Sequence, residues 1–441
     1  MSTNHLYSSG WREHTRTLQH NSPGKKLFKR PLILILFSGC LLAGLVFFFL
    51  GVPWISEQMG RIGSSSSAME KTGDLDDATR KRLSFEIADL KLDPAHLADR
   101  FVLERAGKSL IVESSLDPDL QSYITALLQK SQTLKAAVVV LRHDDGRVLA
   151  MASYDKEGSG ESLCLRADFP AASLFKIVSA AAALESAGFT PEQTVYFDGY
   201  KHTLYKRQLK QKRGKYTSKI SFKRAFGSSI NPVFGKLGIY HLGQRVMVDS
   251  AEKFFFNRSI PFDFPVAKSI VDVPDDNFGL AEIASGFNKS TVISPLHAAL
   301  LASAVANNGV MMKPWLVKRV LQEDGDILYQ GSPDKMGSSI SKETAQDLKI
   351  LMRETVTHGT CRKSFRRLRR KKTFKDVELG AKTGTINDRT DQFKYDWLTA
   401  YVLPPNGRKG ICIAVLGVHG KRLGIRAGKL ARIIINHYLS S

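Results

Sequence analysis

Residues 169–188, FPAASLFKIVSAAAALESAG, are the stretch of sequence that decides both the fold and the chemistry. The stretch is apolar and rich in alanine, which favours a buried helix, and Pro170 suits a chain that enters one. It nevertheless carries Ser173 and Lys176 near its start. Residues three apart lie on one face of a helix, so the hydroxyl and the amine can touch. A serine with a neighbouring lysine as its base is a known activated nucleophile.

The Ser-x-x-Lys spacing has a plain alternative when it stands alone. Ser173 could cap the helix while Lys176 points to water, and the same spacing recurs at Ser153 with Lys156. A motif match remains a hypothesis until its context supports it. The first turn of a helix is one supporting context, because its free N–H groups and positive dipole end favour a developing negative charge. Further support for the motif has to come from the rest of the chain.

Two further motifs follow in the chain. FGSSINPVFGKLG contains Ser229 and Asn231 before an expected helix. LGAKTGTI, on an expected strand, contains Lys382, Thr383, Gly384 and Thr385. Ser-x-x-Lys, Ser-x-Asn and Lys-Thr-Gly, in this order, form the set shared by penicillin-binding proteins and serine β-lactamases. Another Lys-Thr-Gly, at Lys71, lies among acidic residues and lacks strand character, so only the later copy fits.

The chain resembles the penicillin-binding protein transpeptidase domain of the serine D,D-peptidase and β-lactamase-like superfamily, from about residue 111 to the end. The likeness rests on the three motifs and on the segments SSLDPDLQ, GRVLAMAS, ISPLHAALLASAVANNGVMMKP and THGT. It implies an α/β (α+β) fold, with an antiparallel sheet flanked by helices, a mainly helical subdomain and the site between them. The residues agree, because β-rich runs near 136–154 and 377–419 enclose a mainly helical middle.

The resemblance also implies a role for each motif residue. Ser173 would be the nucleophile and Lys176 its general base, with Lys382 as a second cation that lowers the pKa of that base. Ser229 would relay a proton to the leaving amine. The backbone N–H groups of Ser173 and Thr385 would form the oxyanion hole. The expected substrate-binding residues are Asn231, Lys382, Thr383, Gly384 and Thr385, with Gly384 leaving room for the substrate backbone.

This resemblance implies a serine-type D-Ala-D-Ala transpeptidase that cross-links peptidoglycan stem peptides and that β-lactams acylate. Alternatives with the same first step are a D,D-carboxypeptidase and a class D-like β-lactamase, although the latter usually carries Val where this chain has Asn231. A β-lactam or cell-wall sensor, or a scaffold, is the alternative of another class. No cofactor is expected, and no Cys/His cluster has zinc spacing, so no metal is expected either.

The N-terminal part predicts a membrane anchor at residues 31–52. This run carries no charge, and its Leu32–Leu50 part, as a helix, would span about 28 Å. Six cations and the single acid Glu13 precede it, so the N-terminus is expected in the cytoplasm. The rest would lie on the periplasmic side of a bacterial cytoplasmic (inner) membrane. A cleaved signal peptide would have a shorter apolar core, and the lipoprotein-like FSGC places Cys40 in mid-span.

The formal net charge of +22 is unevenly distributed. Beyond the N-terminal tail it concentrates in two basic runs, Lys201–Arg224 and Arg362–Lys375. Outside a membrane such runs favour an anionic lipid or an acidic cell-wall polymer as a partner, with two solvated loops as the alternative. The other expected partners are the stem peptide, β-lactams and the membrane. Nucleic acid is not expected.

The expected organisation has four parts. They are a basic cytoplasmic tail at 1–30, the transmembrane helix at 31–52, a linker and short membrane-proximal segment at 53–110, and the transpeptidase domain at 111–441. Three of the four cysteines, Cys164, Cys361 and Cys412, fall in the exported part. A single disulfide is open to them, but their irregular spacing fits buried or incidental thiols better.

Overall fold

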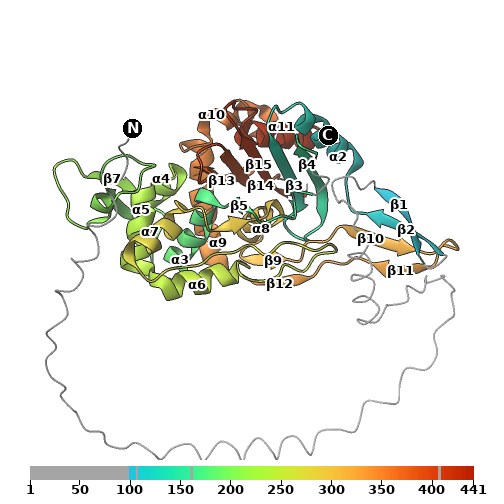
Figure 1. Cartoon of the computed structure of the whole chain (residues 1–441), viewed down its shortest axis with the longest axis horizontal. Coiled ribbons are helices and arrows are strands. Elements are labelled where there is room, and N and C mark those ends of the chain that lie inside the picture. Colours follow the sequence, from blue (N-terminus) through green and yellow to red (C-terminus); the bar gives the residue numbers. More distant parts are fainter. Residues whose placement is uncertain (1–98, 106–107, 159–161, 406–408) are drawn as a thin grey trace, which may run out of the picture. The chain divides into compact units, whose positions relative to one another are not determined.

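The computed structural model describes residues 99–105, 108–158, 162–405 and 409–441 (Figure 1). A sheet with helices on both faces lies beside a mainly helical part (Figure 1). The expected transmembrane helix at 31–52 lies outside the described residues. Within them, no helix has the length and apolar character needed to cross a membrane.

One antiparallel sheet joins early and late segments of the chain. Its strand order is β13-β14-β15-β3-β4, and each neighbouring pair is antiparallel. The strands are β3 (Lys135–Arg142), β4 (Val148–Asp155), β13 (Glu378–Asn387), β14 (Lys394–Leu403) and β15 (Ile411–His419). The expectation of an antiparallel sheet with flanking helices is therefore confirmed. Strand β13, which carries the Lys-Thr-Gly motif, forms one edge of this sheet.

The sheet separates two hydrophobic cores because successive side chains of a strand point to opposite faces. On β3, Val138 and Val140 belong to the smaller core, whereas Ala137 and Val139 belong to the larger one. The covering helices are α2 (Pro118–Gln129) and α11 (Ala427–Ser440) on the smaller core and α8 (Pro295–Ala306) on the larger. Both faces are covered, so the central strands read as continuous apolar runs.

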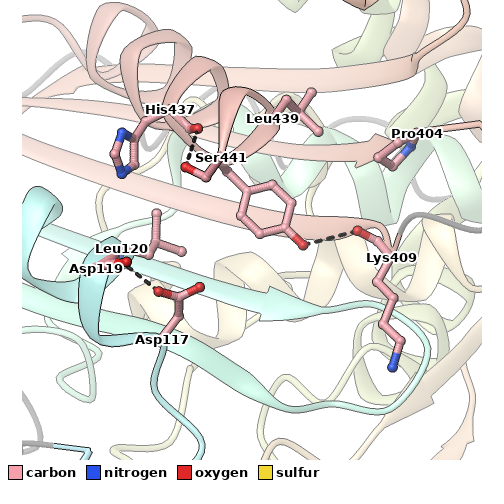
Figure 2. Close-up of a pocket in the computed structure, with 9 residues that line it drawn as sticks. Asp117, Asp119, Leu120, Pro404, Lys409, His437, Leu439 and Ser441 are labelled. Carbon is pink, nitrogen blue, oxygen red and sulfur yellow. Dashed lines mark hydrogen bonds between the residues drawn. The ribbon is translucent and has the colours of Figure 1, made fainter.

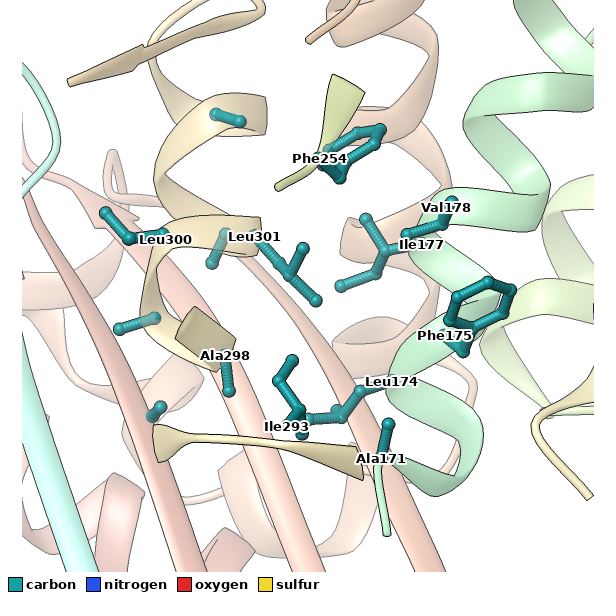
Figure 3. Close-up of a cluster of buried hydrophobic side chains, with 14 of the residues drawn as sticks. Ala171, Leu174, Phe175, Ile177, Val178, Phe254, Ile293, Ala298, Leu300 and Leu301 are labelled. Atoms are coloured by element: carbon teal, nitrogen blue, oxygen red, sulfur yellow. The ribbon is translucent and has the colours of Figure 1, made fainter. Parts of the chain in front are cut away.

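The helical part packs around α3 (Lys176–Ser186). Leu174 and Ile177 share one buried cluster with Ile293 and with Leu301 of α8 (Figure 3). The other helices of this part are η2 (Ala172–Phe175), η3 (Lys206–Leu209), α4 (Phe222–Gly227), α5 (Asn231–Leu237), η4 (Gly238–Leu242), α6 (Gly243–Lys253) and α7 (Asn277–Ser285). Helix α9 (Lys342–Thr357) packs between α4 and β13. Burial on all sides explains why residues 177–184 are all apolar or small.

Short strands complete the fold. A four-stranded sheet has the order β1-β2-β10-β11, and the boundary expected at residue 111 falls within its second strand. Its strands are β1 (Arg100–Arg105), β2 (Lys108–Ser114), β10 (Val317–Leu321) and β11 (Ile327–Gln330). The remaining pairs are β5 (Phe169–Pro170) with β8 (Val292–Ile293), β6 (Thr194–Phe197) with β7 (Ser218–Ser221), and β9 (Val310–Met312) with β12 (Lys335–Ser338). Three short helices follow α9, namely α10 (Arg362–Phe365), η5 (Leu368–Arg370) and η6 (Lys372–Phe374).

Cys164, Cys361 and Cys412 are buried and form no disulfide. Burial raises the pKa of the Cys361 thiol to about 12 and also raises that of Cys412. A thiol whose pKa is raised stays protonated at neutral pH and packs as a small apolar group. The three cysteines are therefore buried thiols, as their spacing indicated.

The cores give a stability prediction. Leu300 of α8 is fully buried, so Leu300→Ala should lower the free energy of unfolding by about 2–5 kcal/mol through lost burial and the cavity left behind. The matched control is Leu423→Ala, at a leucine that is 54% exposed, which should change it by less than about 0.5 kcal/mol. Denaturant unfolding of the two variants measures both values. Equal effects would mean that α8 does not close this core.

Candidate active site

Ser173 lies on a short turn between a strand and a helix. The entry is fixed to the sheet, because Nε1 of Trp397 donates to the carbonyl of Pro170 at 2.9 Å. The turn η2 carries Ser173 and continues directly into α3. Ala172, just before the serine, has φ of +49°, a left-handed conformation that is uncommon for a residue with a side chain. The structure therefore puts Ser173 at a helix start, on a 3-10 turn rather than an α-helical one.

Lys176 is fully buried, and its amine is surrounded by three oxygen atoms. Nζ lies 2.9 Å from Oγ of Ser173 and 2.8 Å from Oδ1 of Asn231, and it also contacts the carbonyl of Ser285. Burial, and next the charge of Lys382, hold the pKa of Lys176 well below its ordinary value. The amine is therefore neutral at lower pH than an exposed lysine.

Three contacts surround the amine of Lys176. An ammonium would donate to all three oxygens, whereas an uncharged –NH₂ has two hydrogens to donate and one lone pair to accept with. Oδ1 of Asn231 and the Ser285 carbonyl can only accept, so in the uncharged form they take the two hydrogens and the lone pair is left for the O–H of Ser173. The side-chain contact that the sequence spacing predicted between Ser173 and Lys176 is present.

Asn231, the first residue of α5, is itself held in one orientation. Its Nδ2 donates to the carbonyl of His202 at 3.0 Å, which turns Oδ1 toward Lys176. Its backbone N–H donates to the carbonyl of Lys201 at 2.7 Å. The loop at 201–202 therefore fixes which amide atom meets the base.

Lys382 and Ser229 form the second pair of the site. Nζ of Lys382 donates to Oγ of Ser229 at 3.0 Å and to the carbonyl of Thr383 at 2.8 Å. Burial lowers the pKa of Lys382 to about 7. Ser229 is buried and has φ of +54°, a second left-handed residue in the site. The backbone is thus left-handed at Ala172 and at Ser229, and the two serines of the site contact buried lysines. Backbone strain of this kind is common at functional sites.

The threonines of β13 have side-chain partners of their own. Oγ1 of Thr383 lies 2.6 Å from Oγ1 of Thr360, and Oγ1 of Thr385 donates to Oδ1 of Asp396 at 3.3 Å. Arg426 donates to both oxygens of Asp396 at 2.8 Å. Burial alone would raise the pKa of Asp396, but hydrogen bonds from His419, Arg426 and the N–H of Ala427, with the charge of Arg426, lower it to about 2. Asp396 therefore stays ionised and orients Thr385.

Gly384 also lies close to the turn that carries Ser173. A Cβ at this position would lie 3.2 Å from Cβ of Ala172 and 3.3 Å from the carbonyl of Ala171. The missing side chain thus makes room for this turn, whereas the expected room for a substrate backbone stays a prediction. The same Cβ would lie 3.4 Å from the backbone nitrogen of Ser173, so β13 passes directly beside the N–H of the nucleophile.

Three residues of the site were not singled out from the sequence. Thr360 belongs to THGT, a segment noticed only for its likeness to the family. His202 lies within the first basic run, its Nδ1 is 3.3 Å from the carbonyl of Ser229, and burial is the main cause of its lowered pKa. Ser285 acts through its backbone carbonyl, which no side-chain pattern reveals. No sequence pattern marks His202 either, because it lies 27 residues before Ser229 and meets the motif only through tertiary packing.

Both basic runs begin beside the site. Residues 201–202 contact Ser229 and Asn231, and the run at 362–375 follows Thr360 by one residue. The second run is pinned by buried Phe365, Leu368 and Phe374, and its cations are exposed. The two runs are therefore ordered surface segments next to the motifs.

A separate cavity of about 310 Å³ lies between α2 and α11 (Figure 2). None of the motif residues lines it. Asp117 is used as a helix cap, accepting from the N–H of Leu120 at 3.0 Å, and Tyr438 donates to the carbonyl of Lys409 at 3.1 Å. Nowhere among the residues that the structure describes do three or more His, Cys, Asp or Glu side chains form a potential metal site. The motif cluster is the candidate active site.

Comparison with known proteins agrees with this geometry. Peptidoglycan D,D-transpeptidase PbpA of Mycolicibacterium smegmatis is 26% identical over 409 residues, covering 84% of this chain and 78% of that protein. PbpA of Mycobacterium tuberculosis is 26% identical over 381 residues, covering 78% and 74%. The chain is thus a homologue of serine-type peptidoglycan D,D-transpeptidases.

Solved structures share the fold. Penicillin-binding protein A from M. tuberculosis, as an imipenem acyl-enzyme complex, superposes with a TM-score of 0.61 at 24% identity, covering 74% of this chain and 79% of that one. A D,D-transpeptidase domain from Eggerthella lenta has a TM-score of 0.61 at 22% identity, covering 75% and 82%. Residues 136–435, which hold all three motifs, match the family described as penicillin binding protein transpeptidase domain, and the chain belongs to that family.

Proposed function

We propose that this protein is a peptidoglycan D,D-transpeptidase that cross-links stem peptides through a serine acyl-enzyme. The observation that carries the proposal is the buried Lys176 amine, whose Nζ lies 2.9 Å from Oγ of Ser173. A general base has to lie within hydrogen-bonding distance of the proton that it removes, with a pKa near the working pH. Lys176 meets the first condition, and the lowered pKa moves it toward the second.

The acylation step follows from these positions. Oγ of Ser173 attacks the penultimate carbonyl of a stem peptide ending in D-Ala-D-Ala, and Lys176 takes the hydroxyl proton. The N–H groups of Ser173 and Thr385 stabilise the oxyanion, an effect typically worth about 3–4 kcal/mol per donor. The C–N bond then breaks, and D-alanine leaves with a proton delivered through Ser229. An amine of a second stem peptide attacks the ester and restores the serine.

The donor stem peptide ends in the carboxylate of its terminal D-alanine. Lys382 provides a cation beside it, and the hydroxyls of Thr383 and Thr385 provide donors on the exposed edge of β13. Thr360 extends this row through its contact with Thr383. Charge-assisted hydrogen bonds of this kind are about twice as strong as neutral ones. Asn231 would accept from the peptide amide through rearrangement of its contact with Lys176.

Two further parts of the proposal concern the surroundings of the enzyme. We place residues 31–52 as a single helix in the bacterial cytoplasmic (inner) membrane, with residues 111–441 on the periplasmic side. The charge-free run and the cations before it support this. The partners are then the stem peptide, β-lactams, the membrane, and an anionic lipid or cell-wall polymer at the basic runs.

The nucleophile is tested with Ser173→Ala. Covalent labelling by a fluorescent penicillin should disappear, because the attacking oxygen is removed while its apolar surroundings stay packed. The matched control is Ser153→Ala, at the other Ser-x-x-Lys spacing, which should label like the wild type. Labelling that persists in Ser173→Ala, or that moves to Ser229, would overturn the assignment. Slow deacylation of the wild type supports a transpeptidase, and rapid turnover would indicate a β-lactamase.

The pH dependence tests the two lysines. Lys382 loses its charge as the pH rises through about 7, so the second-order rate of acylation by a carboxylate-bearing substrate should fall above that pH. The rate should also fall on the acid side, where Lys176 becomes protonated. Lys382→Arg keeps a cation at every accessible pH, and should abolish the alkaline fall whatever its absolute rate. An alkaline limb that is unchanged in this variant would exclude Lys382 as its origin.

Topology is tested with a fusion. A reporter enzyme that is active only outside the cytoplasm should work when attached after Ser441 and fail when attached before Met1. If both fusions are active, the protein is cleaved or peripheral. If only the fusion before Met1 is active, the orientation is opposite to the one proposed.

A further inference from the structure

Residues 198–217, between β6 and β7, form a compact surface unit that we call the cationic lobe. Gln208, which is 2% exposed, holds it together. Its Nε2 donates to the carbonyl of Asp198 at 2.7 Å, and its Oε1 accepts from the backbone N–H of Tyr205 at 2.9 Å. Leu204 and Leu209 are buried against Ala281 of α7. The lobe is therefore packed into one conformation, although its sequence reads as a solvated basic loop.

The lobe carries seven cations and one acid. The cations are Lys201, Lys206, Arg207, Lys210, Lys212, Arg213 and Lys215. Its acid, Asp198, is already paired with Lys236 of α5 at 3.6 Å. Holding like charges close together in an ordered unit opposes folding. Asp198 does not neutralise the seven cations, and their remaining positive charge makes the lobe a preformed surface for an anion.

Aromatic rings accompany these cations. Tyr200 is 81% exposed and Tyr216 is 86% exposed, which is unusual for rings of this size. The guanidinium of Arg213 lies 3.7 Å from the ring centre of Tyr196. A tyrosine offers an apolar face and a polar tip, a combination that suits ligands with both kinds of surface. Cyclic sugars have apolar C–H faces and polar edges.

A cavity of about 400 Å³ lies between the lobe and the helices α5 and η4. Its lining combines apolar side chains and aromatic rings with amide, hydroxyl and cationic groups, as small-molecule sites commonly do. The polar and aromatic members include Gln193, Tyr196, Gln211, Arg213, Lys236 and Tyr240. Of these, Tyr240 is held in place, because its hydroxyl donates to the carbonyl of Leu209 at 2.9 Å.

Helix α5 links the cavity to the active site. Lys201 and His202 of the lobe accept from Asn231 through their carbonyls, and α5 runs from Asn231 to the cavity-lining Lys236. Five residues of helix correspond to about 8 Å. A ligand that extends over a few sugar units can therefore occupy the cavity while a peptide branch reaches Ser173.

We propose that the cationic lobe and its cavity bind the carboxylate-bearing amino-sugar chain of the substrate polymer. This inference rests on the proposed transpeptidase function, and adds a glycan subsite beside the peptide subsite. Cations recognise the carboxylates, and the tyrosine rings pack on sugar faces. The lobe would raise the local concentration of polymeric substrate, and its contribution would weaken with salt over the Debye length of about 8–10 Å.

An anionic membrane fits the lobe less well. Binding in a membrane interface normally combines cations with apolar side chains that enter the acyl region. The leucines of the lobe, Leu204 and Leu209, are both buried, so within residues 198–217 only tyrosines provide exposed large rings. The lobe also lies against the Ser-x-Asn motif, where substrate has to arrive. Position and composition both favour the glycan.

The test compares two charge-matched variants of the full chain in detergent. Lys212→Gln/Arg213→Gln/Lys215→Gln removes three charges from the lobe. The control, Arg366→Gln/Arg367→Gln/Arg370→Gln, removes three exposed charges from the second basic run and spares Arg369 and Lys371, which make hydrogen bonds. The probes are glycan chains stripped of their peptides, which carry a lactyl carboxylate on each muramic acid, and vesicles containing phosphatidylglycerol.

The lobe variant should bind the glycan chains about tenfold more weakly, whereas the control should lose less than twofold. Both should acylate with a small penicillin at the wild-type rate, which shows that the fold and active site are intact. Tyr196→Leu should weaken glycan binding without any change in charge. Equal losses in both charge variants, no loss in the lobe variant, or a loss confined to vesicles would overturn the proposal.

The same measurements separate this inference from the proposed function. Failure of the transpeptidase proposal would appear as wild-type protein that a penicillin does not label, whatever its glycan binding. Failure of the glycan subsite would appear as normal labelling together with glycan binding that does not depend on the lobe.

Discussion

The buried amine of Lys176 is the constraint on which the rest of the site depends. A charged ammonium at a fully buried position is costly unless it is paired, and the amine has no carboxylate among its contacts. In the uncharged form its two hydrogens and one lone pair can meet the three oxygen neighbours. The environment lowers the pKa of the amine, as a general base requires. It does so by desolvation, with the charge of Lys382 as the smaller effect.

Backbone packing around Ser173 holds the oxygen atoms that contact Lys176 in place. Gly286 ends α7 with φ of +62°, and a Cβ there would come 2.0 Å from the carbonyl of Ala172. Only glycine lets α7 end against the nucleophile turn, which brings the Ser285 carbonyl to the amine. On the opposite side, Gly384 admits the same turn against β13. Two glycines on distant segments thus fix one strained turn, and Ala172 tolerates its left-handed backbone because both neighbours are packed against it.

The sequence predicted those features of the site that depend on side-chain spacing. Ser173 and Lys176 meet because they stand three positions apart in a helical segment, and the β-rich runs predicted the sheet that carries Lys382. Ser285 and His202 were missed because both orient the site through backbone carbonyls, whose positions depend on tertiary packing. The proximity of Gly384 to the turn at Ala172 was not predicted, since the sequence does not show which other part of the chain a glycine faces. The basic run at 201–224 read as a loop, because the single Gln208 that orders it gives no periodic signal.

Asn231 connects the two halves of the site. A side-chain amide is planar, so its Oδ1 and Nδ2 cannot turn independently. Because Nδ2 donates to the carbonyl of His202, any rotation that frees this bond also removes Oδ1 from the amine of Lys176. His202 of the cationic lobe and the amine of Lys176 are thus two contacts of one rigid group. The position of the Lys176 amine therefore depends on the packing of a surface loop, which a buried glutamine and two buried leucines hold in place although its exterior carries seven cations.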